Sequence, residues 1–227
     1  MAPRYAIYFV PRRDSELYRF GISILGYDAY AGASVRQDAD LRAWQAAAEG
    51  PRRYGFHATL KAPFHMPAYV SEHALVDAVR RFALSRSAVP PVKLHVARLG
   101  GFAVLRPIGS CVELNKLAGD CVTAFEPFRA SLTDHDRDRR AGLDLSHRQK
   151  TYLEQWGYPH VFDDFRFHMT LLGPLPSDCE KHIHNMLRAK FGQFTGAEQL
   201  VVDRIALLRQ AEAGAPFVVI HSACFAG

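Results

Sequence analysis

The feature that most constrains this chain is a short pattern that occurs twice. Phe-His-x-Thr-Leu, with proline six positions after the histidine, spans residues 56–63 and again 167–174, and its histidines lie 168 − 57 = 111 residues apart. Residues two apart on a strand point to the same face, so each copy places an imidazole beside a hydroxyl. The apolar residues of each copy then face the opposite side and pack. Two copies that fold against each other would bring two histidines and two threonines into one cleft.

Size and composition indicate a folded globular protein. The 227 residues suffice for one large domain or two small lobes, and 48% hydrophobic with 22% charged residues is typical of soluble proteins. The net charge of +5 favours anionic ligands but does not by itself indicate nucleic-acid binding. The N-terminus has no secretory signal pattern, and no apolar stretch approaches the ~20 residues needed to cross a bilayer. We therefore expect a cytoplasmic protein.

The cysteines support the same expectation, because none of the four forms a C-x-x-C pair, which argues against a zinc knuckle or a disulfide framework. They are Cys111, Cys121, Cys179 and Cys224.

The order of predicted elements is similar in the two halves of the chain. The first half shows a strand at 5–10, a helix capped by Asp14 or Ser15, the first histidine strand, a helix capped by Ser71, and a hairpin at 92–98 and 102–105. The second half shows a strand at 111–115, helices at about 116–127 and 146–156, the second histidine strand, a helix after the capping box Ser177-x-x-Glu180, and strands at 200–208 and 217–222.

This order predicts an α+β fold with two pseudo-symmetric lobes. Each lobe is expected to hold an antiparallel-rich sheet with helices on its outer side, and the two lobes flank a central cleft. We expect a single bilobed domain over 1–227, with interleaved lobes that correspond approximately to 1–109 and 110–227. The segments 26–53, a loop around a short helix centred on Trp44, and 134–148, which is rich in charge, interrupt the repeat and are candidate lids or rims.

Two histidines with two hydroxyl donors suit phosphodiester cleavage. A neutral imidazole at His57 or His168 takes a proton from the attacking oxygen while the other, protonated, gives one to the leaving oxygen. The hydroxyls of Thr59 and Thr170 would donate to the non-bridging phosphate oxygens, whose charge grows toward the transition state. A metal site is the main chemical alternative, but neither copy carries H-E-x-x-H or a two-histidine-one-carboxylate pattern. We expect no metal and no cofactor.

Five further residues are candidate substrate contacts, each with a purely structural role as its alternative. Four of them lie in or beside the predicted strands and the motifs: Tyr8, Tyr54, Arg166 and Arg209. The fifth, Lys61, is four positions after His57 and would share its face if the strand alternates regularly. The pair His182 and His184 diverges on a helix and is expected to face solvent.

The paired motifs resemble those of the two-histidine phosphoesterase superfamily, which includes RNA 2′-5′ ligase-like proteins and cyclic phosphodiesterases. Five segments are more narrowly similar to its phosphonate-metabolism branch: Arg4–Phe9, Tyr18–Gly21, Tyr54–Phe64, Trp156–Pro159 and Phe165–Leu171. The resemblance implies a two-lobed α+β fold, metal-independent phosphoester chemistry, His57 and His168 as acid and base, and Thr59 and Thr170 as phosphate ligands. It also implies a small sugar or nucleotide cyclic phosphate as substrate.

The sequence thus predicts a monomeric phosphoric diester hydrolase of the cyclic phosphodiesterase type, linked to phosphonate metabolism and without a membrane partner. Two alternatives stay open. One is an RNA-processing 2′-5′ ligase or RNA cyclic phosphodiesterase, which the segments 26–53 and 134–148 make less favourable because RNA-acting members lack such insertions. The other is a nucleotide- or RNA-binding module without turnover.

Overall fold

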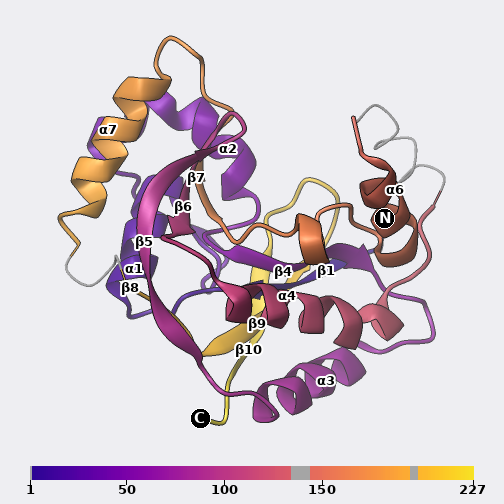
Figure 1. The fold of residues 1–227 in the computed structure, drawn as a ribbon. Helices are drawn as coiled ribbons and strands as arrows, with labels where there is room; N and C mark the ends of the chain where they lie inside the picture. The colour runs from indigo at the N-terminus through magenta and orange to yellow at the C-terminus, as the bar shows by residue number, and fades with distance from the viewer. Residues whose placement is uncertain (1, 134–143, 195–198) are drawn as a thin grey trace.

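One curled antiparallel sheet organises the protein, as seen in a computed structural model that describes residues 2–133, 144–194 and 199–227 (Figure 1). Among these residues the sheet has eight strands in the order β10-β9-β1-β4-β7-β6-β5-β8, and β2 and β3 form a separate two-stranded ribbon. The strands are β1 (Arg4–Phe9), β2 (Tyr27–Asp28), β3 (Ala33–Ser34), β4 (Ala58–His65), β5 (Val89–Leu99), β6 (Phe102–Pro107), β7 (Met169–Leu172), β8 (Gln199–Val202), β9 (Arg204–Gln210) and β10 (Val218–Cys224).

Two half-sheets meet where the histidine motifs lie. The first half-sheet is β10-β9-β1-β4 and the second is β7-β6-β5-β8, and their junction is the antiparallel pair Ala58–Met169 between β4 and β7. Each half-sheet takes two strands from before residue 109 and two from after it. The half-sheets are therefore interleaved along the chain, and the approximate halves 1–109 and 110–227 do not correspond to them.

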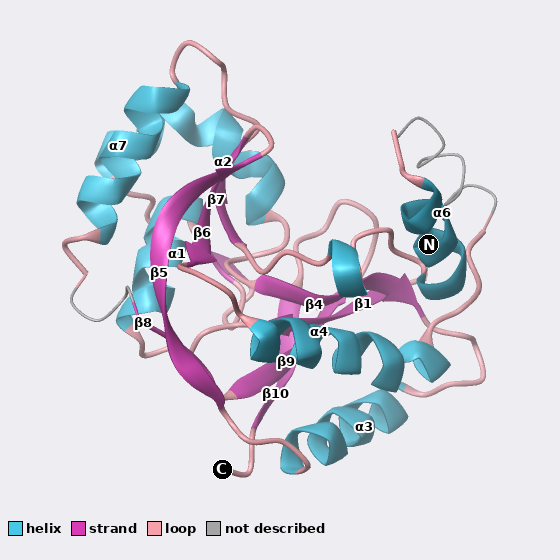
Figure 2. Cartoon of the chain, viewed as in Figure 1, coloured by secondary structure: helices cyan, strands magenta, loops and turns pink. Residues whose placement is uncertain are grey.

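Helices pack on both half-sheets, as Figures 1 and 2 show. The first half-sheet carries α3 (Glu72–Leu84) against β9 and β10, and α4 (Val112–Ala124) against β4. The second carries α1 (Glu16–Leu25) and α2 (Gln45–Arg52) against β7, and α7 (Glu180–Phe191) against β5. Among the described residues, the remaining helix, α6 (His147–Trp156), and three 3₁₀ turns, η1 (Ala39–Trp44), η2 (Glu126–Phe128) and η3 (Phe162–Asp164), lie in the connections. The predicted α+β class is confirmed.

Helix capping follows the sequence signals at three N-termini. Ser15 Oγ accepts from the Tyr18 amide at the start of α1, and Ser71 Oγ accepts from the Ala74 amide at the start of α3. At α6, Ser146 and Gln149 form a reciprocal capping box. These side chains satisfy amides that the first helical turn leaves without intrahelical partners.

Three predicted elements are wrong. The expected strand at 111–115 is the beginning of α4, because Leu114, Leu117, Ala118 and Cys121 have helical spacing and all pack inward. The Ser177 capping box does not form, since α7 begins at Glu180 with no side-chain cap at Cys179. The single strand expected at 200–208 is two strands, β8 and β9, which separate at Asp203 and join different half-sheets.

Only the first of the two interrupting segments can be compared with expectation over its whole length. The segment 26–53 holds the β2–β3 ribbon and a continuous helical stretch of η1 followed by α2, so it is more ordered than a loop. Most of the segment 134–148 lies outside the described residues. The description resumes at residue 144, and α6 begins at His147. Of the described helices, none has both the length and the apolar character required to cross a lipid bilayer.

One glycine fixes how the first motif packs. Gly21 lies on α1, fully within the core, and a methyl group built there would overlap the ring of Phe56, the residue before the first motif histidine.

We expect Gly21→Ala to destabilise the protein by about 1–3 kcal/mol through overpacking, although alanine is the better helix former. Chemical denaturation would measure this, with Ser23→Ala on the same helix as the control, which should change stability little. Equal stability of Gly21→Ala and the wild type would contradict the argument.

Candidate active site

The junction between the half-sheets sets the geometry of the site. In an antiparallel ladder the numbers of facing residues have a constant sum, and the pair Ala58–Met169 gives 58 + 169 = 227. His57 therefore faces Thr170 (57 + 170 = 227), and Thr59 faces His168 (59 + 168 = 227). Facing side chains share one side of the sheet with Cβ atoms roughly 4.5–5.5 Å apart. The two copies of the motif thus form two facing His–Thr pairs, related by a pseudo-two-fold axis through Ala58 and Met169.

All four side chains line one cavity of about 260 Å³. The other residues of this cavity, which we call the catalytic pocket, come mainly from β1, β4 and the segments before the motifs. They are Arg4, Tyr8, Tyr54, Ala62, Pro63 and Tyr158. Of the sequence-predicted contacts, Tyr8 and Tyr54 therefore lie in the pocket, whereas Lys61, Arg166 and Arg209 do not line it.

The same backbone contact orients both imidazoles. His57 Nδ1 lies 2.9 Å from the carbonyl oxygen of Gly55, and His168 Nδ1 lies 2.7 Å from the carbonyl oxygen of Arg166, in each case two residues earlier. A carbonyl only accepts hydrogen bonds, so each Nδ1 carries a proton and donates it. In the neutral ring the lone pair is then on Nε2. Both histidines are held in the tautomer that leaves Nε2 to accept a proton or, once charged, to donate one.

Glycine is required at one of these carbonyls. Gly55 has φ +73°, in the left-handed region, and a Cβ there would meet the Cβ of Ala29 at 2.8 Å. This turn aims the Gly55 carbonyl at His57. On the other edge of the ring, His57 Nε2 lies 3.1 Å from Thr59 Oγ1, so the hydroxyl of its own motif donates to the lone pair.

The surroundings of His57 favour its neutral form. The ring of Tyr8 stacks on it with centroids 3.8 Å apart and planes 21° from parallel. Burial lowers the pKa of His57 from 6.5 to about 4, opposed by the Gly55 carbonyl and assisted by the nearby His168. Burial also raises the pKa of the Tyr8 hydroxyl well above 10. The pair is therefore uncharged at neutral pH.

His168 is also kept neutral, but by different neighbours. Burial lowers its pKa below 6.5, the Arg166 carbonyl opposes this, and the charges of Arg106 and His160 lower the pKa further. Arg106 lies on β6 next to Leu105, which pairs with Met169, so the ladder places Arg106 across from His168. An anion bound between the two imidazoles would raise both pKa values, since opposite charge favours the protonated form.

Lys61 does not reach the pocket because β4 is irregular. Tyr8 pairs with Thr59, but Ile7 pairs with Lys61, so the register shifts by one residue between them. This extra residue reverses the alternation, and Lys61 faces the same side as Ile7, away from the motif residues. Its ammonium is buried and donates to the Val122 carbonyl at 2.9 Å and to Glu126 at 2.8 Å. The predicted contact with substrate is corrected: Lys61 attaches β4 to the end of α4.

Arg209 is likewise engaged elsewhere. It is exposed on β9 and its Nη1 lies 3.2 Å from Glu72 on α3, which also accepts from the hydroxyl of Tyr5. Burial and Glu72 raise the pKa of Tyr5 to about 12. Arg209 therefore fastens α3 to the first half-sheet. The prediction for His184 is also corrected, because this residue is buried on α7 beside Glu180 instead of facing solvent.

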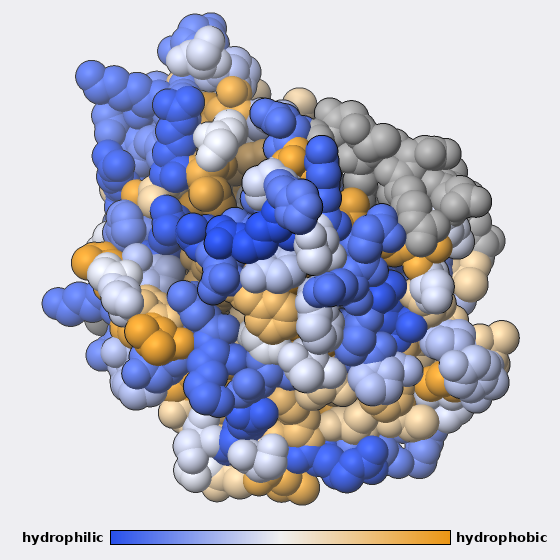
Figure 3. All heavy atoms as spheres, turned by 45° about the vertical axis from the view of Figure 1, so that its right-hand side comes forward, coloured by the Kyte–Doolittle hydropathy of each residue, from blue (hydrophilic) through white to orange (hydrophobic). Residues whose placement is uncertain are grey.

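A second, mostly apolar cavity of about 290 Å³ adjoins the catalytic pocket. The two share Thr59, Ala62, Tyr158 and His168, and the walls of the second come from α4 and the segment 158–166. Arg166, the remaining sequence-predicted contact, lines this second cavity. Hydrophobic surface recessed between hydrophilic rims is visible on the face drawn in Figure 3. Such a lining suits an uncharged part of a ligand.

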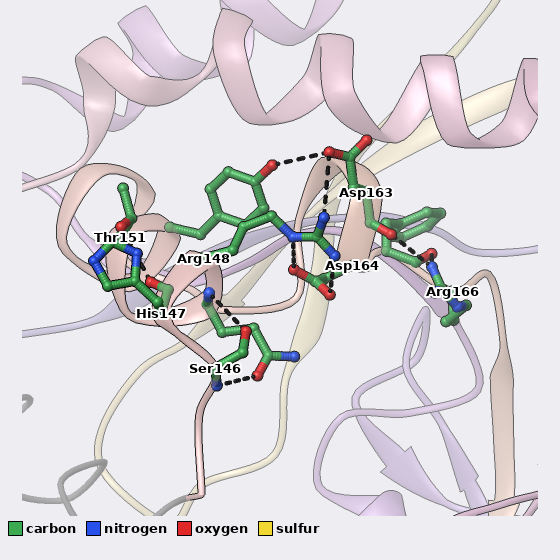
Figure 4. Close-up of polar contacts among 10 residues, drawn as sticks. Ser146, His147, Arg148, Thr151, Asp163, Asp164 and Arg166 are labelled. Carbon is green, nitrogen blue, oxygen red and sulfur yellow. Dashed lines mark hydrogen bonds and ion pairs between the residues drawn. The ribbon is translucent and has the colours of Figure 1, made fainter.

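An ion-pair cluster holds the wall segment in place (Figure 4). Arg148 on α6 donates to the two carboxylate oxygens of Asp164 at 2.9 and 3.1 Å, and this keeps the pKa of Asp164 low. Arg166 donates to the carbonyls of Asp163 and Phe165 at 2.8 and 2.7 Å. The backbone before His168 is thereby tied to α6.

Sequence reasoning missed four residues that line the two cavities or act on a motif histidine. Arg4 and Tyr158 line the catalytic pocket, His160 lines the second cavity, and the charge of Arg106 lowers the pKa of His168. The sequence could have indicated Arg4, because it lies four positions before Tyr8 on the same strand and so shares its face. The others depend on long-range pairing. Within the described part of the chain, no group of three or more His, Cys, Asp or Glu side chains is arranged to hold a metal ion.

Comparisons with known proteins found a matching family and two curated relatives. Residues 59–218 match the model of a family described as "Protein of unknown function (DUF1045)". The chain is 34% identical to the protein named ribose 1,5-bisphosphate phosphokinase PhnN of Janthinobacterium sp. (strain Marseille), over 99% of this chain and 51% of that protein. It is 35% identical to the protein of the same name from Laribacter hongkongensis (strain HLHK9), over 94% and 50%. The chain thus spans about half the length of the curated relatives it matches.

Among solved structures, the chain is similar to E. coli LigT complexed with 3′-AMP. The TM-score is 0.47 and the sequence identity 14%, with full coverage of both chains.

The stack of Tyr8 on His57 leads to a measurable expectation. Tyr8→Ala should admit water to the imidazole, so the pKa of His57 should rise from about 4 toward 6.5. An NMR titration of the ring protons would measure it. Tyr54→Ala serves as the control, because its ring centroid is 6.3 Å from that of His57 and should change this pKa less. An unaltered pKa in a folded Tyr8→Ala protein would rule out this stack as the cause.

Proposed function

The chain belongs to the DUF1045 family, and we propose that it is a metal-independent phosphoesterase of the two-histidine type, linked to phosphonate metabolism. Its substrate is a cyclic phosphate or phosphodiester of a small sugar or nucleotide. The observation that carries the proposal is the pair of facing His–Thr motifs around one cavity, with both Nδ1 atoms committed to backbone carbonyls.

In the proposed reaction one proton is removed from the attacking water and one proton is added to the leaving oxygen. Nε2 of one neutral histidine takes a proton from the water that attacks phosphorus, and Nε2 of the other, protonated, gives its proton to the leaving oxygen. The bond from phosphorus to that oxygen breaks, and a phosphomonoester results. The hydroxyls of Thr59 and Thr170 donate to the non-bridging oxygens, where negative charge grows in the transition state.

We assign the base to His57 in the hydrolytic direction. Its pKa of about 4 keeps it neutral across the physiological range, as a base must be. His168 then acts as the acid, and the bound phosphate supplies the negative charge that favours its protonated form. The reverse reaction exchanges the two roles.

The names of the relatives support a link to phosphorylated ribose. A hydrolase that opened a cyclic phosphate on ribose 5-phosphate would yield a ribose bisphosphate, the class of compound named as substrate of those kinases. The present chain has no Gly-Lys dipeptide and so lacks the loop Gly-x₄-Gly-Lys-Ser/Thr that cradles nucleotide phosphates. This supports assigning the kinase reaction to the half of the relatives that the chain does not match.

The small cavity favours a small substrate over RNA. At about 260 Å³ the catalytic pocket lies just below the usual range of ligand sites, about 300–1,000 Å³. The neighbouring cavity adds room for one substituent of a small substrate, but not for a strand of RNA.

The alternative that the protein only binds its ligand predicts measurable affinity without formation of a product.

Removing either histidine should abolish efficient turnover. We expect His57→Ala and His168→Ala each to lower kcat for ribose cyclic phosphates by roughly 10²–10⁴. Phosphorus NMR would follow the appearance of the monoester. His95→Ala, at an exposed position on β5, is the control and should retain wild-type rates. Undiminished turnover in either motif variant would remove the mechanism, and binding without turnover by the wild type would favour the binding-only alternative.

The pH dependence should place the optimum of kcat/KM on the acid side of neutrality. Below about pH 4 His57 is protonated in the free protein and cannot act as base. As the pH rises through the pKa of His168, which lies below 6.5, the acid is lost. Because the bound anion raises both pKa values, kcat should peak at a higher pH than kcat/KM. A kcat/KM that continues to rise above pH 7 would contradict the assignment.

A further inference from the structure

The catalytic pocket contains one permanent charge and nothing to neutralise it. Its lining includes no Asp or Glu, and burial keeps the two imidazoles neutral, which leaves the guanidinium of Arg4 as the only fixed charge among the described lining residues. Within the described chain no carboxylate pairs with Arg4. Arginines are usually matched by an acid when they are half-buried as this one is, so the charge is available for a ligand.

Neutral groups hold this arginine in position. Gln210 faces Arg4 directly in the β1–β9 ladder and is buried, with 3% of its surface exposed. Its Oε1 accepts from Arg4 Nε at 2.7 Å, and its amide donates to the Ala215 carbonyl at 2.6 Å, so both ends of the buried amide are used. The guanidinium also lies over the ring of Phe217, 5.7 Å from its centroid. These contacts orient Arg4 but leave its charge intact, and among the described residues neither terminal nitrogen donates a hydrogen bond to another residue.

The position of Arg4 separates it from the reacting phosphate. Tyr8 pairs with Thr59 at the motif, and Arg4 is four positions earlier on the strand, about 13 Å away between Cα atoms. Arg4 instead pairs with His65, six positions beyond Thr59. An arginine side chain spans only part of that distance. A group bound by Arg4 therefore lies in the same pocket as the phosphate between the histidines, but at its far end.

From this geometry we infer that Arg4 is a specificity residue that binds a second anionic group, so that the substrate is a small sugar or nucleotide carrying a further phosphate besides the ester that is cleaved. The inference rests on the proposed function for the identity of the first group. Arginine suits the role because its planar fork can bind two phosphate oxygens at once. Gln210 is a positioning residue that keeps the fork aimed at the pocket.

Binding and turnover would be measured with matched ligands that differ by one phosphate. Calorimetry would compare ribose 1,5-bisphosphate with ribose 1-phosphate, and kinetics would compare ribose 2,3-cyclic phosphate with and without a 5-phosphate. The wild type should prefer the doubly phosphorylated member of each pair by about ten-fold or more. Arg4→Gln should remove this preference while leaving the affinity for the singly phosphorylated ligand unchanged, and Arg4→Lys should keep part of it.

Arg209→Gln is the matched control, since Arg209 lies on the adjacent strand but outside the pocket, and it should keep the full preference. Thermal unfolding would show whether each variant is folded. If Arg4→Gln does not fold, the comparison with the wild type is made with Arg4→Lys instead. An equal loss for both ligands would overturn the inference and assign Arg4 to the reacting phosphate. The absence of any preference in the wild type would overturn it as well.

The two proposals fail in different ways. If no cyclic phosphate is hydrolysed but Arg4→Gln still abolishes the preference for ribose 1,5-bisphosphate, the second anion site stands and the hydrolytic function falls. If cyclic phosphates are hydrolysed equally well with and without the 5-phosphate, the hydrolytic function stands and the role of Arg4 falls.

Discussion

The single backbone pairing of Ala58 with Met169 is the constraint on which the candidate site depends. It joins the two half-sheets, and its register alone makes His57 face Thr170 and Thr59 face His168. A slip by one residue would turn every side chain of one motif to the other face of the sheet. The apolar members of the motifs prevent this slip, because Phe56, Ala58 and Leu60 on one copy and Phe167, Met169 and Leu171 on the other are all buried. The packing of the core therefore fixes the register, and the register brings the polar groups together.

Orientation of the imidazoles is achieved by backbone, and their protonation is controlled by burial. The carbonyls of Gly55 and Arg166 set the same tautomer at both histidines, so neither ring needs a carboxylate partner. A carboxylate would have raised the histidine pKa values, whereas burial lowers them. The proposed acid therefore gains its proton in response to a bound anion. In this arrangement the negative charge of the bound substrate favours the protonated histidine that the proposed chemistry requires as its acid.

The sequence was sufficient for features encoded locally or by repetition. The motif, its strand alternation and the caps at Ser15 and Ser71 each depend on a few neighbouring residues, and they led to the α+β class and to the four polar groups. It was insufficient wherever a distant partner decides the outcome. The irregular register opposite Ile7 turns Lys61 away from the pocket, and Glu72 on α3 engages Arg209. The strand expected at 111–115 is the start of a helix. Its helical spacing becomes visible only when Leu117, Ala118 and Cys121 are included, and its apolar face packs against β4.

The two copies of the motif hold their histidines in the same way, but the residues around the two histidines differ. This difference would let one histidine act as the base and the other as the acid. On the first half-sheet, β1 places the ring of Tyr8 over His57. On the second, β6 places Arg106 across from His168, and His160 adds its charge. Both settings lower a histidine pKa mainly through burial, and like charge adds to this at both, from His168 at His57 and from Arg106 and His160 at His168. The guanidinium of Arg106 is the permanent charge among these groups, and a phosphate bound beside His168 can offset it. Two rings of identical local geometry can in this way hold different protonation states when substrate is bound, as acid–base catalysis by a pair requires.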